Sequence, residues 1–276
     1  MCVLLTCGVT DAMAQMRVRF NNETADTIVL TSILMDLEQM RGADSETLVA
    51  EAGKRFLGKP YKGGTLESDE KEMLTVNTDE LDCTTFVETA LALAMTAESR
   101  RSSWHDFVWN LTRLRYRGGE VDGYPSRLHY ISDWIVDNTH KDIILEVTDR
   151  ITNASYQVKT LDYMSSHKDA YKALADSAAL AGIKNVEVGY RSHRYPYIRS
   201  ANVKNVSLKE GDVIAITTGT KGLDVSHMGI VVMVDGVPHL MHASSKEGKV
   251  VIDKLSLADY LRRTRAQGIR VIRLKD

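Results

Sequence analysis

The chain contains 276 residues with a mass of 30.8 kDa, of which 43% are hydrophobic and 26% are charged. This length suits one large domain or two small ones, and the composition excludes a mainly disordered chain. The 35 Lys and Arg residues nearly balance the 37 Asp and Glu residues, so no overall positive field favours nucleic acid. No stretch approaches the roughly 18 apolar residues of a membrane-spanning helix, and we expect no stable membrane insertion.

The N-terminal segment is apolar and ends in an export-type cleavage pattern. Residues 3–9 are mostly apolar, and Ala12-Met13-Ala14 has the A-x-A form of a signal cleavage site. The basic residues that usually begin such a signal are missing. We expect residues 1–14 to be an export signal remnant and the protein to be periplasmic or otherwise exported from a bacterium. Whether Cys7 carries a lipid stays open.

The region 36–97 is predicted to be helical. Residues 36–40 and 45–57 carry apolar side chains at helical spacing, with Ser45 in the N-cap position of the second helix. A nearly all-apolar stretch then covers residues 84–95, which is typical of a helix buried in a core. Cys83 therefore stands at the N-terminus of this buried helix.

The rest of the chain divides into an insertion and a β-rich end. Residues 98–205 are richer in charge and aromatic side chains and are predicted to form a mainly helical insertion, with segments at 104–115, 127–138 and 165–181. Residues 206–276 contain β-branched runs separated by turn residues, at 211–216, 225–234, 237–243 and 268–274. Asp235-Gly236 between two of these runs indicates a hairpin. Helices followed by an antiparallel sheet give an α+β fold.

Cys83 is the one cysteine of the expected folded region, because Cys2 and Cys7 lie near the chain start. The free amides and the positive dipole end of a helix N-terminus lower a thiol pKa and can donate to an oxyanion. Cys83 is therefore a candidate nucleophile. The alternative is a small buried hydrophobic residue without a chemical role.

Histidines near the C-terminal end supply candidates for a base. Cysteine catalysis needs an imidazole that takes the thiol proton and a third group that orients this imidazole. His227 begins one apolar run, and the next run carries His239 and His242. The last two are three residues apart, so they point to opposite faces of a strand and only one can orient His227. A solvated surface position is the alternative for His227.

Several short motifs occur in a fixed order along the chain. They are Gly58-Lys59-Pro60-Tyr61, Asp82-Cys83-Thr84-Thr85-Phe86-Val87, Lys209-Glu210-Gly211-Asp212-Val213-Ile214, Ser226-His227-Met228-Gly229-Ile230-Val231 and Met241-His242-Ala243-Ser244. Together they resemble the NlpC family of papain-like cell-wall cysteine hydrolases. The resemblance implies a papain-like core of N-terminal helices packed on an antiparallel sheet. It also implies that Cys83 is the nucleophile, His227 the general base and His242 the orienting residue, with Tyr61 lining the site.

Two further segments resemble the N-acetylmuramoyl-L-alanine amidase-like branch of this superfamily. They are Tyr61-Lys62-Gly63-Gly64-Thr65-Leu66-Glu67 and Tyr124-Pro125-Ser126-Arg127-Leu128-His129-Tyr130-Ile131-Ser132-Asp133-Trp134-Ile135. The resemblance implies a cysteine amidase, without cofactor or metal, that hydrolyses the amide between N-acetylmuramic acid and L-alanine of muropeptides. Thr84-Thr85 after the cysteine fits this branch better than the endopeptidases. Two amides at the helix start are expected to stabilise the oxyanion.

Substrate contact is expected from neighbours of the nucleophile and base and from one part of the insertion. These residues are Tyr61, Asp82, Thr84, Arg127, His129, Tyr130 and Ser226. Arg127 is suited to hold a carboxylate, and Tyr130 is suited to stack on a sugar ring. His129 and Asp133 would share one helical face. The alternative is that this segment only presents the apolar face of a helix to the core.

Other functions stay open at this stage. A D,L-endopeptidase that cuts the stem peptide would use the same catalytic residues. A zinc amidase would use Cys83 and the histidines as ligands, although no H-E-x-x-H motif occurs. A non-catalytic wall-binding module would be expected to lack the cysteine or the histidine. We expect a monomer that acts on a muropeptide or peptidoglycan fragment; the choice between His239 and His242, the stem length and the need for an anhydro sugar stay open.

Overall fold

The structure is a computed structural model, and it describes residues 18–40, 42–68 and 71–275. Its α-helices are α1 (Glu23–Glu38), α2 (Ser45–Lys54), α3 (Cys83–Glu98), α4 (Trp104–Arg115), α5 (Ile131–His140), α6 (Tyr163–Ser166), α7 (Ser177–Gly189) and α8 (Leu257–Thr264). Its strands are β1 (Val18–Phe20), β2 (Leu74–Val76), β3 (Ile144–Glu146), β4 (Ser155–Lys159), β5 (His193–Arg199), β6 (Val213–Thr217), β7 (Val225–Val234), β8 (Val237–Ser244), β9 (Lys249–Ser256) and β10 (Gly268–Leu274).

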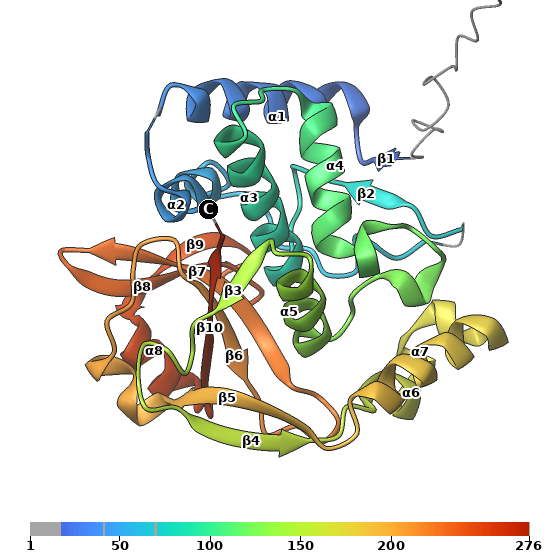
Figure 1. Cartoon of the computed structure of the whole chain (residues 1–276). Helices are drawn as coiled ribbons and strands as arrows, with labels where there is room; N and C mark the ends of the chain where they lie inside the picture. The colour runs from blue at the N-terminus through green and yellow to red at the C-terminus, as the bar shows by residue number, and fades with distance from the viewer. Residues whose placement is uncertain (1–17, 41, 69–70, 276) are drawn as a thin grey trace, which may run out of the picture.

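An antiparallel sheet of eight strands organises the molecule. Its strands follow the order β4-β5-β10-β6-β7-β8-β9, and β3 pairs with β10 beside this path. Helices α1 to α4 lie together on one side of the sheet, and α6 and α7 lie beyond its far end (Figure 1). The described chain is therefore a mixed α+β structure with an antiparallel sheet, as the sequence predicted.

Both faces of the central strands are buried, which explains their continuous hydrophobic runs. Along β6, Val213 and Ala215 join the core beneath the N-terminal helices, whereas Ile214 and Ile216 join a second core with Leu261 of α8. Because successive side chains of β6 point into two different apolar cores, every position of this strand needs an apolar residue. The N-terminal helices thus cover one face of these strands, and α8 covers the other.

Helix α3 is the centre of the larger core. Every residue from 85 to 97 is buried, and the helix packs directly on β7 and β8. The charged Glu88 within it accepts from Arg115 of α4 at 2.6 Å, and Arg115 also donates to the carbonyl of Thr75 in β2. This ion pair connects α3, α4 and the small β1–β2 sheet in the protein interior.

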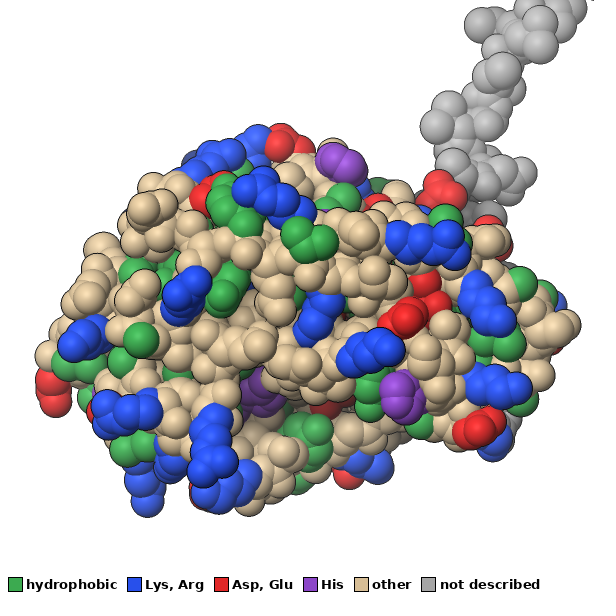
Figure 2. All heavy atoms as spheres, turned by 90° about the horizontal axis from the view of Figure 1, so that it is seen from below, with side chains coloured by type: hydrophobic (Ala, Val, Ile, Leu, Met, Phe, Trp, Pro, Cys, Tyr) green, Lys and Arg blue, Asp and Glu red, His purple; other side chains and the backbone are tan. Residues whose placement is uncertain are grey.

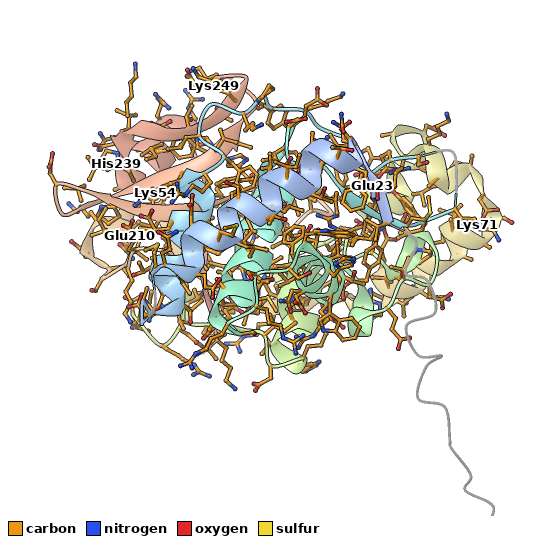
Figure 3. All side chains as sticks on the ribbon, turned by 90° about the horizontal axis from the view of Figure 1, so that it is seen from above. Glu23, Lys54, Lys71, Glu210, His239 and Lys249 are labelled. Carbon is orange, nitrogen blue, oxygen red and sulfur yellow. The ribbon has the colours of Figure 1, made fainter. Side chains whose placement is uncertain are left out.

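A contact at the outer edge joins the helical part of the chain to the sheet. Lys54, the last residue of α2, lies 3.0 Å from Glu210, which precedes β6, and Figure 3 shows the two side chains together. Gly211 follows at φ 80°, and a Cβ there would lie 2.0 Å from the Glu46 carbonyl oxygen. Only glycine allows this close approach of the two backbones.

The predicted hairpin is confirmed. Strands β7 and β8 pair in antiparallel register, and Asp235 and Gly236 between them have φ angles of 51° and 77°. Two left-handed residues in a two-residue loop form the turn that matches the right-handed twist of the strands. This turn fixes which residues of β7 and β8 face each other.

Several predicted boundaries differ from the structure. Asp44, and not Ser45, caps α2, because the Asp44 side chain accepts from the amide of Thr47. The segment 127–138 becomes helical only at Ile131, after a 3₁₀ turn that contains Pro125. The helix predicted at 165–181 is divided by 3₁₀ turns, and α7 begins only at Ser177 because Asp176 caps it.

The insertion also contributes strands that the sequence analysis did not identify. Strands β3, β4 and β5 arise within residues 98–205 and join the large sheet, and β9 extends it at the other end. The expected export segment at residues 1–14 lies outside the described residues. Among the described residues, each helix is too short or too polar to pass through a lipid bilayer.

We predict that Glu88→Ala lowers the free energy of unfolding by about 3–5 kcal/mol, because Arg115 keeps a buried charge without its partner. Urea unfolding followed by circular dichroism measures this loss. The matched control is Asp106→Ala, which removes the exposed partner of Arg101 and should cost less than about 1 kcal/mol. Equal losses in the two variants would contradict a structural role of the buried pair.

Candidate active site

Cys83 is the first residue of α3, and Asp82 immediately before it caps the helix. Asp82 Oδ1 accepts from the backbone amides of Thr84 at 3.1 Å and Thr85 at 2.8 Å, and the Thr85 hydroxyl accepts from the Asp82 amide at 2.9 Å. This reciprocal capping box fixes the start of the helix and therefore the position of the thiol. The predicted placement of Cys83 at a helix N-terminus is confirmed.

The Asp82 cap also changes which backbone amides can donate to an oxyanion. Two amides of the first turn, those of Thr84 and Thr85, are already occupied by Asp82. The expectation of two free helix-start amides is therefore wrong for this structure. The amide of Cys83 itself lies beside the sulfur, where its hydrogen bonding lowers the pKa of the thiol. It is the helix-start donor that faces the reacting atom.

His227 and His242 form a pair between neighbouring strands. His227 Nε2 lies 2.6 Å from His242 Nδ1, and the two rings are nearly perpendicular. Ile230 of β7 stands opposite Met241 of β8, and this register makes the two histidines diagonal neighbours on one face of the sheet. The contact expected of an orienting residue is thus made by His242.

The His239 side chain lies on the face of β8 opposite to His242. It stands opposite Val232 in the strand pairing, and its Nδ1 lies 2.8 Å from the carbonyl oxygen of Asp253. Figure 3 shows the His239 side chain on the strands of the large sheet. Because three residues separate it from His242, the two side chains leave the strand on opposite faces. His239 therefore contacts β9, whereas the partner of His227 is His242.

Two tyrosines and one backbone amide connect Cys83 with the histidine pair. Hydrogen bonding from the backbone of Met228, the residue after His227, lowers the pKa of the Cys83 thiol. Burial raises the pKa of Tyr61 and of Tyr260, and a charge on Cys83 would raise both further, so both tyrosines lie within electrostatic range of the thiol. The Tyr260 ring also packs against His242 with centroids 5.3 Å apart. The thiol and the two imidazoles therefore share their surroundings.

Burial keeps all three groups neutral. Burial and, after it, the negative charge of Asp82 raise the pKa of Cys83 to about 11, and hydrogen bonds only partly oppose these two effects. Burial likewise lowers the pKa of His227 to about 3 and of His242 to about 4. The sequence predicted a lowered thiol pKa from the helix dipole. Desolvation and the capping carboxylate reverse this direction.

The chain matches a protein-family model over residues 51–269, and this family is described as AmiA-like and N-acetylmuramoyl-L-alanine amidase-like. The match covers most of the chain, from α2 to β10, and contains every candidate site residue. The chain belongs to the AmiA-like family. Among curated proteins, no match was found.

Solved structures agree with membership of the AmiA-like family. An N-acetylmuramoyl-L-alanine amidase from Bacteroides uniformis is 39% identical, with a TM-score of 0.81 over 85% of this chain and 100% of that chain. A Bacteroides fragilis protein with the provisional name of xylanase is 43% identical, with a TM-score of 0.77 over 82% of this chain and 100% of that one. A Legionella pneumophila protein, 22% identical with a TM-score of 0.69 over 92% and 95% of the chains, shares the fold.

The residues expected to contact substrate from the insertion are mostly buried and paired. Arg127 is 4% exposed, donates to Glu67 at 2.6 Å and lies 3.6 Å from Glu72. Tyr130 donates to Glu187 at 2.8 Å within a separate hydrophobic cluster. The guanidinium that was expected to hold a substrate carboxylate is therefore bound to carboxylates of the protein itself.

His129 and Asp133 do not share a helical face, because His129 precedes the first residue of α5. Its Nε2 lies 2.9 Å from the Tyr124 carbonyl oxygen. Asp133 is instead held by both terminal nitrogens of Arg117 and by the Tyr190 hydroxyl. In the structure, His129 and Asp133 are thus held by two separate sets of contacts within the protein. Contact of these residues with substrate stays a prediction.

The remaining expected residues surround Cys83 and His227. Tyr61 is half-buried, the Thr84 hydroxyl lies 4.0 Å from the Cys83 sulfur, and Ser226 is exposed beside His227. Asp82 uses Oδ1 for the helix cap, as described above. These positions are adjacent to the candidate reacting groups, and their contact with substrate stays a prediction.

The sequence analysis missed the contribution of α8. Tyr260 lies against His242, and Arg263 binds Asp253 at 2.9 Å, which fixes α8 to β9. The signal available was an amphipathic pattern after Ser256, whose side chain caps this helix. Across the described ranges, no group of three or more His, Cys, Asp or Glu side chains is arranged to hold a metal.

We predict that Cys83 reacts slowly with iodoacetamide at pH 7 and faster as the pH approaches 11. With a pKa of about 11, about 10⁻⁴ of the thiol is ionised at pH 7, and only the thiolate reacts. Asp82→Asn keeps a capping side chain but removes the charge, so it should raise the rate at pH 8. Peptide mass spectrometry at Cys83 measures both.

The control for this experiment is Asp106→Asn in the first turn of α4, which removes a charge from the start of another helix. It should leave the pH profile of Cys83 unchanged. A wild-type rate at pH 7 equal to that of free cysteine would show that the thiol is not held protonated.

Proposed function

We propose that this AmiA-like protein is a cysteine amidase with a papain-like, NlpC-type core that hydrolyses the amide between N-acetylmuramic acid and L-alanine of muropeptides. The observation that carries the proposal is the contact of His227 with His242 at 2.6 Å, together with the hydrogen bonding of the half-buried Cys83 thiol to the backbone of Met228, the residue after His227. The family membership supports an amidase of peptidoglycan-type substrates. The relative from Bacteroides uniformis carries the same amidase name.

The neutral state of the groups determines how the proton moves in this proposal. His227 Nε2 is engaged by His242, so Nδ1 remains to accept the Cys83 proton. Because the thiol pKa is raised and the imidazole pKa is lowered, the proton leaves sulfur as the sulfur attacks the amide carbonyl, and not before. His227 then gives this proton to the leaving amine, and water hydrolyses the thioester.

The capping of α3 determines which groups face the oxyanion. The Cys83 amide is the helix-start donor beside the sulfur, and Tyr61 lies close to the thiol. Preorganised donors in a site of low polarity stabilise a tetrahedral oxyanion strongly. We further propose that residues 98–205 shape the substrate cleft and that the protein acts as an exported, periplasmic enzyme.

Cys83→Ala is predicted to reduce amidase turnover below about 10⁻⁴ of wild type, because no other group replaces the attacking sulfur. The variant should unfold within about 1 kcal/mol of wild type, since the lost side chain is small. Turnover measured on purified muropeptides tests the predicted loss of activity, and urea unfolding tests the predicted stability. Wild-type turnover in Cys83→Ala would contradict the cysteine mechanism, and inhibition of the wild type by a chelator would favour a zinc amidase instead.

The product identifies the bond that is cut. Mass spectrometry should show free disaccharide and an intact stem peptide. A disaccharide-dipeptide product would identify a D,L-endopeptidase. Release of xylose oligomers from xylan without action on muropeptides would favour the activity that the provisional name of the Bacteroides fragilis relative suggests.

His227→Ala is predicted to lower kcat more than His242→Ala, because an orienting residue contributes less than the base that moves the proton. His239→Ala is the matched control, since the structure binds this ring to the Asp253 carbonyl on the other face of β8. Its kcat should stay within about twofold of wild type. A larger loss in His239→Ala than in His242→Ala would reverse the assignment of the orienting residue.

A further inference from the structure

A cavity of about 190 Å³ opens directly beside His227. Its walls come from three segments: the end of β6, the start of β7 and the C-terminal end of α8 with the following turn. The lining side chains that matter here are those of Thr217, Ser226, His227, Tyr260, Arg265 and Gln267. Figure 2, which views the molecule from below, shows a recessed histidine in a hollow with Lys and Arg side chains to one side.

The position of this cavity relative to His227 indicates which part of a substrate it would hold. In the proposed reaction, which this inference takes as its basis, His227 gives its proton to the leaving amine. The leaving nitrogen must therefore lie within hydrogen-bonding distance of the imidazole. A cavity that begins at His227 lies on the side of the leaving group, and in an N-acetylmuramoyl-L-alanine amidase the leaving group is the stem peptide.

The charge of the lining favours an anion. Arg265 carries the full positive charge, no Asp or Glu is found among the lining residues, and His227 is neutral because its pKa is lowered to about 3. Hydrogen-bond donors are also available from Gln267 and Thr217. The hydroxyl of Thr217, a residue 1% exposed, has no partner in the described part of the chain. Arginine with neutral donors is a common environment for a carboxylate.

The volume of the cavity limits the bound group to a single amino-acid residue of the substrate. Sites for drug-sized molecules typically enclose about 300–1,000 Å³, so a cavity of about 190 Å³ is too small for a disaccharide or a whole stem peptide. In a muropeptide the residue after L-alanine is a glutamate linked through its γ-carboxyl, which leaves its α-carboxylate free. We propose that this cavity binds that α-carboxylate and that Arg265 is the residue that selects it.

Kinetics on two substrates test the inference. One is N-acetylmuramoyl-L-alanyl-γ-D-glutamate, and the other differs only by an α-carboxamide in place of the free carboxylate. Wild type should prefer the carboxylate, and Arg265→Gln should lower kcat/KM for it about tenfold, mainly through KM, and remove the preference. Arg265→Lys keeps the charge and should retain part of the preference.

The matched control is Arg262→Gln, which removes an exposed arginine of the same helix that pairs with Asp259 and does not line the cavity. It should behave as wild type on both substrates. Equal kcat/KM of wild type for the two substrates, or an equal effect of Arg265→Gln on both, would overturn the carboxylate site while leaving the amidase proposal intact. No cleavage of either substrate by wild type at the muramoyl–alanine bond would refute both proposals.

Discussion

The docking of one buried helix on the sheet fixes the geometry of the candidate site. Helix α3 is buried from residue 85 to 97 and lies on β7 and β8, the two strands that carry the paired histidines. The start of this helix cannot move without opening the core, and Asp82 fixes its first turn. The sulfur, the strand amide of Met228 and the imidazoles are thus positioned by packing, not by a flexible loop.

The electrostatics of this arrangement differ from those of an ion-paired cysteine hydrolase. A helix N-terminus usually stabilises a thiolate, but here a carboxylate occupies the amides that would do so, and burial opposes charge on all three groups. Within the described residues no carboxylate is hydrogen-bonded to His242, and burial lowers its pKa despite the nearby charges of Asp253 and Glu247. With its pKa raised in this way, the Cys83 thiol keeps its proton at neutral pH.

The sequence allowed the helix start at Cys83 and the central strands of the sheet to be predicted, but not the side chains that surround the candidate site. Cys83 was placed correctly because a long apolar run follows it, and the β7–β8 hairpin was identified from its Asp-Gly turn. The pairing of Arg127 with Glu67 was not foreseen, since some 60 residues separate them and nothing local indicates the contact. The role of Tyr260 was missed for the same reason: side-chain neighbours across distant elements have no short-range signal.

A thiol that stays protonated also resists chemical damage. Peroxide and disulfides attack the thiolate, so a cysteine with a raised pKa is oxidised far more slowly than the reactive cysteines of redox sensors. In the exported enzyme proposed above, no cytosolic pool of reductants would protect the sulfur, and a thiolate would be oxidised to sulfenic acid or mixed disulfides more readily than a thiol. Burial, together with the carboxylate that caps α3, thus keeps Cys83 in the thiol form that is oxidised more slowly.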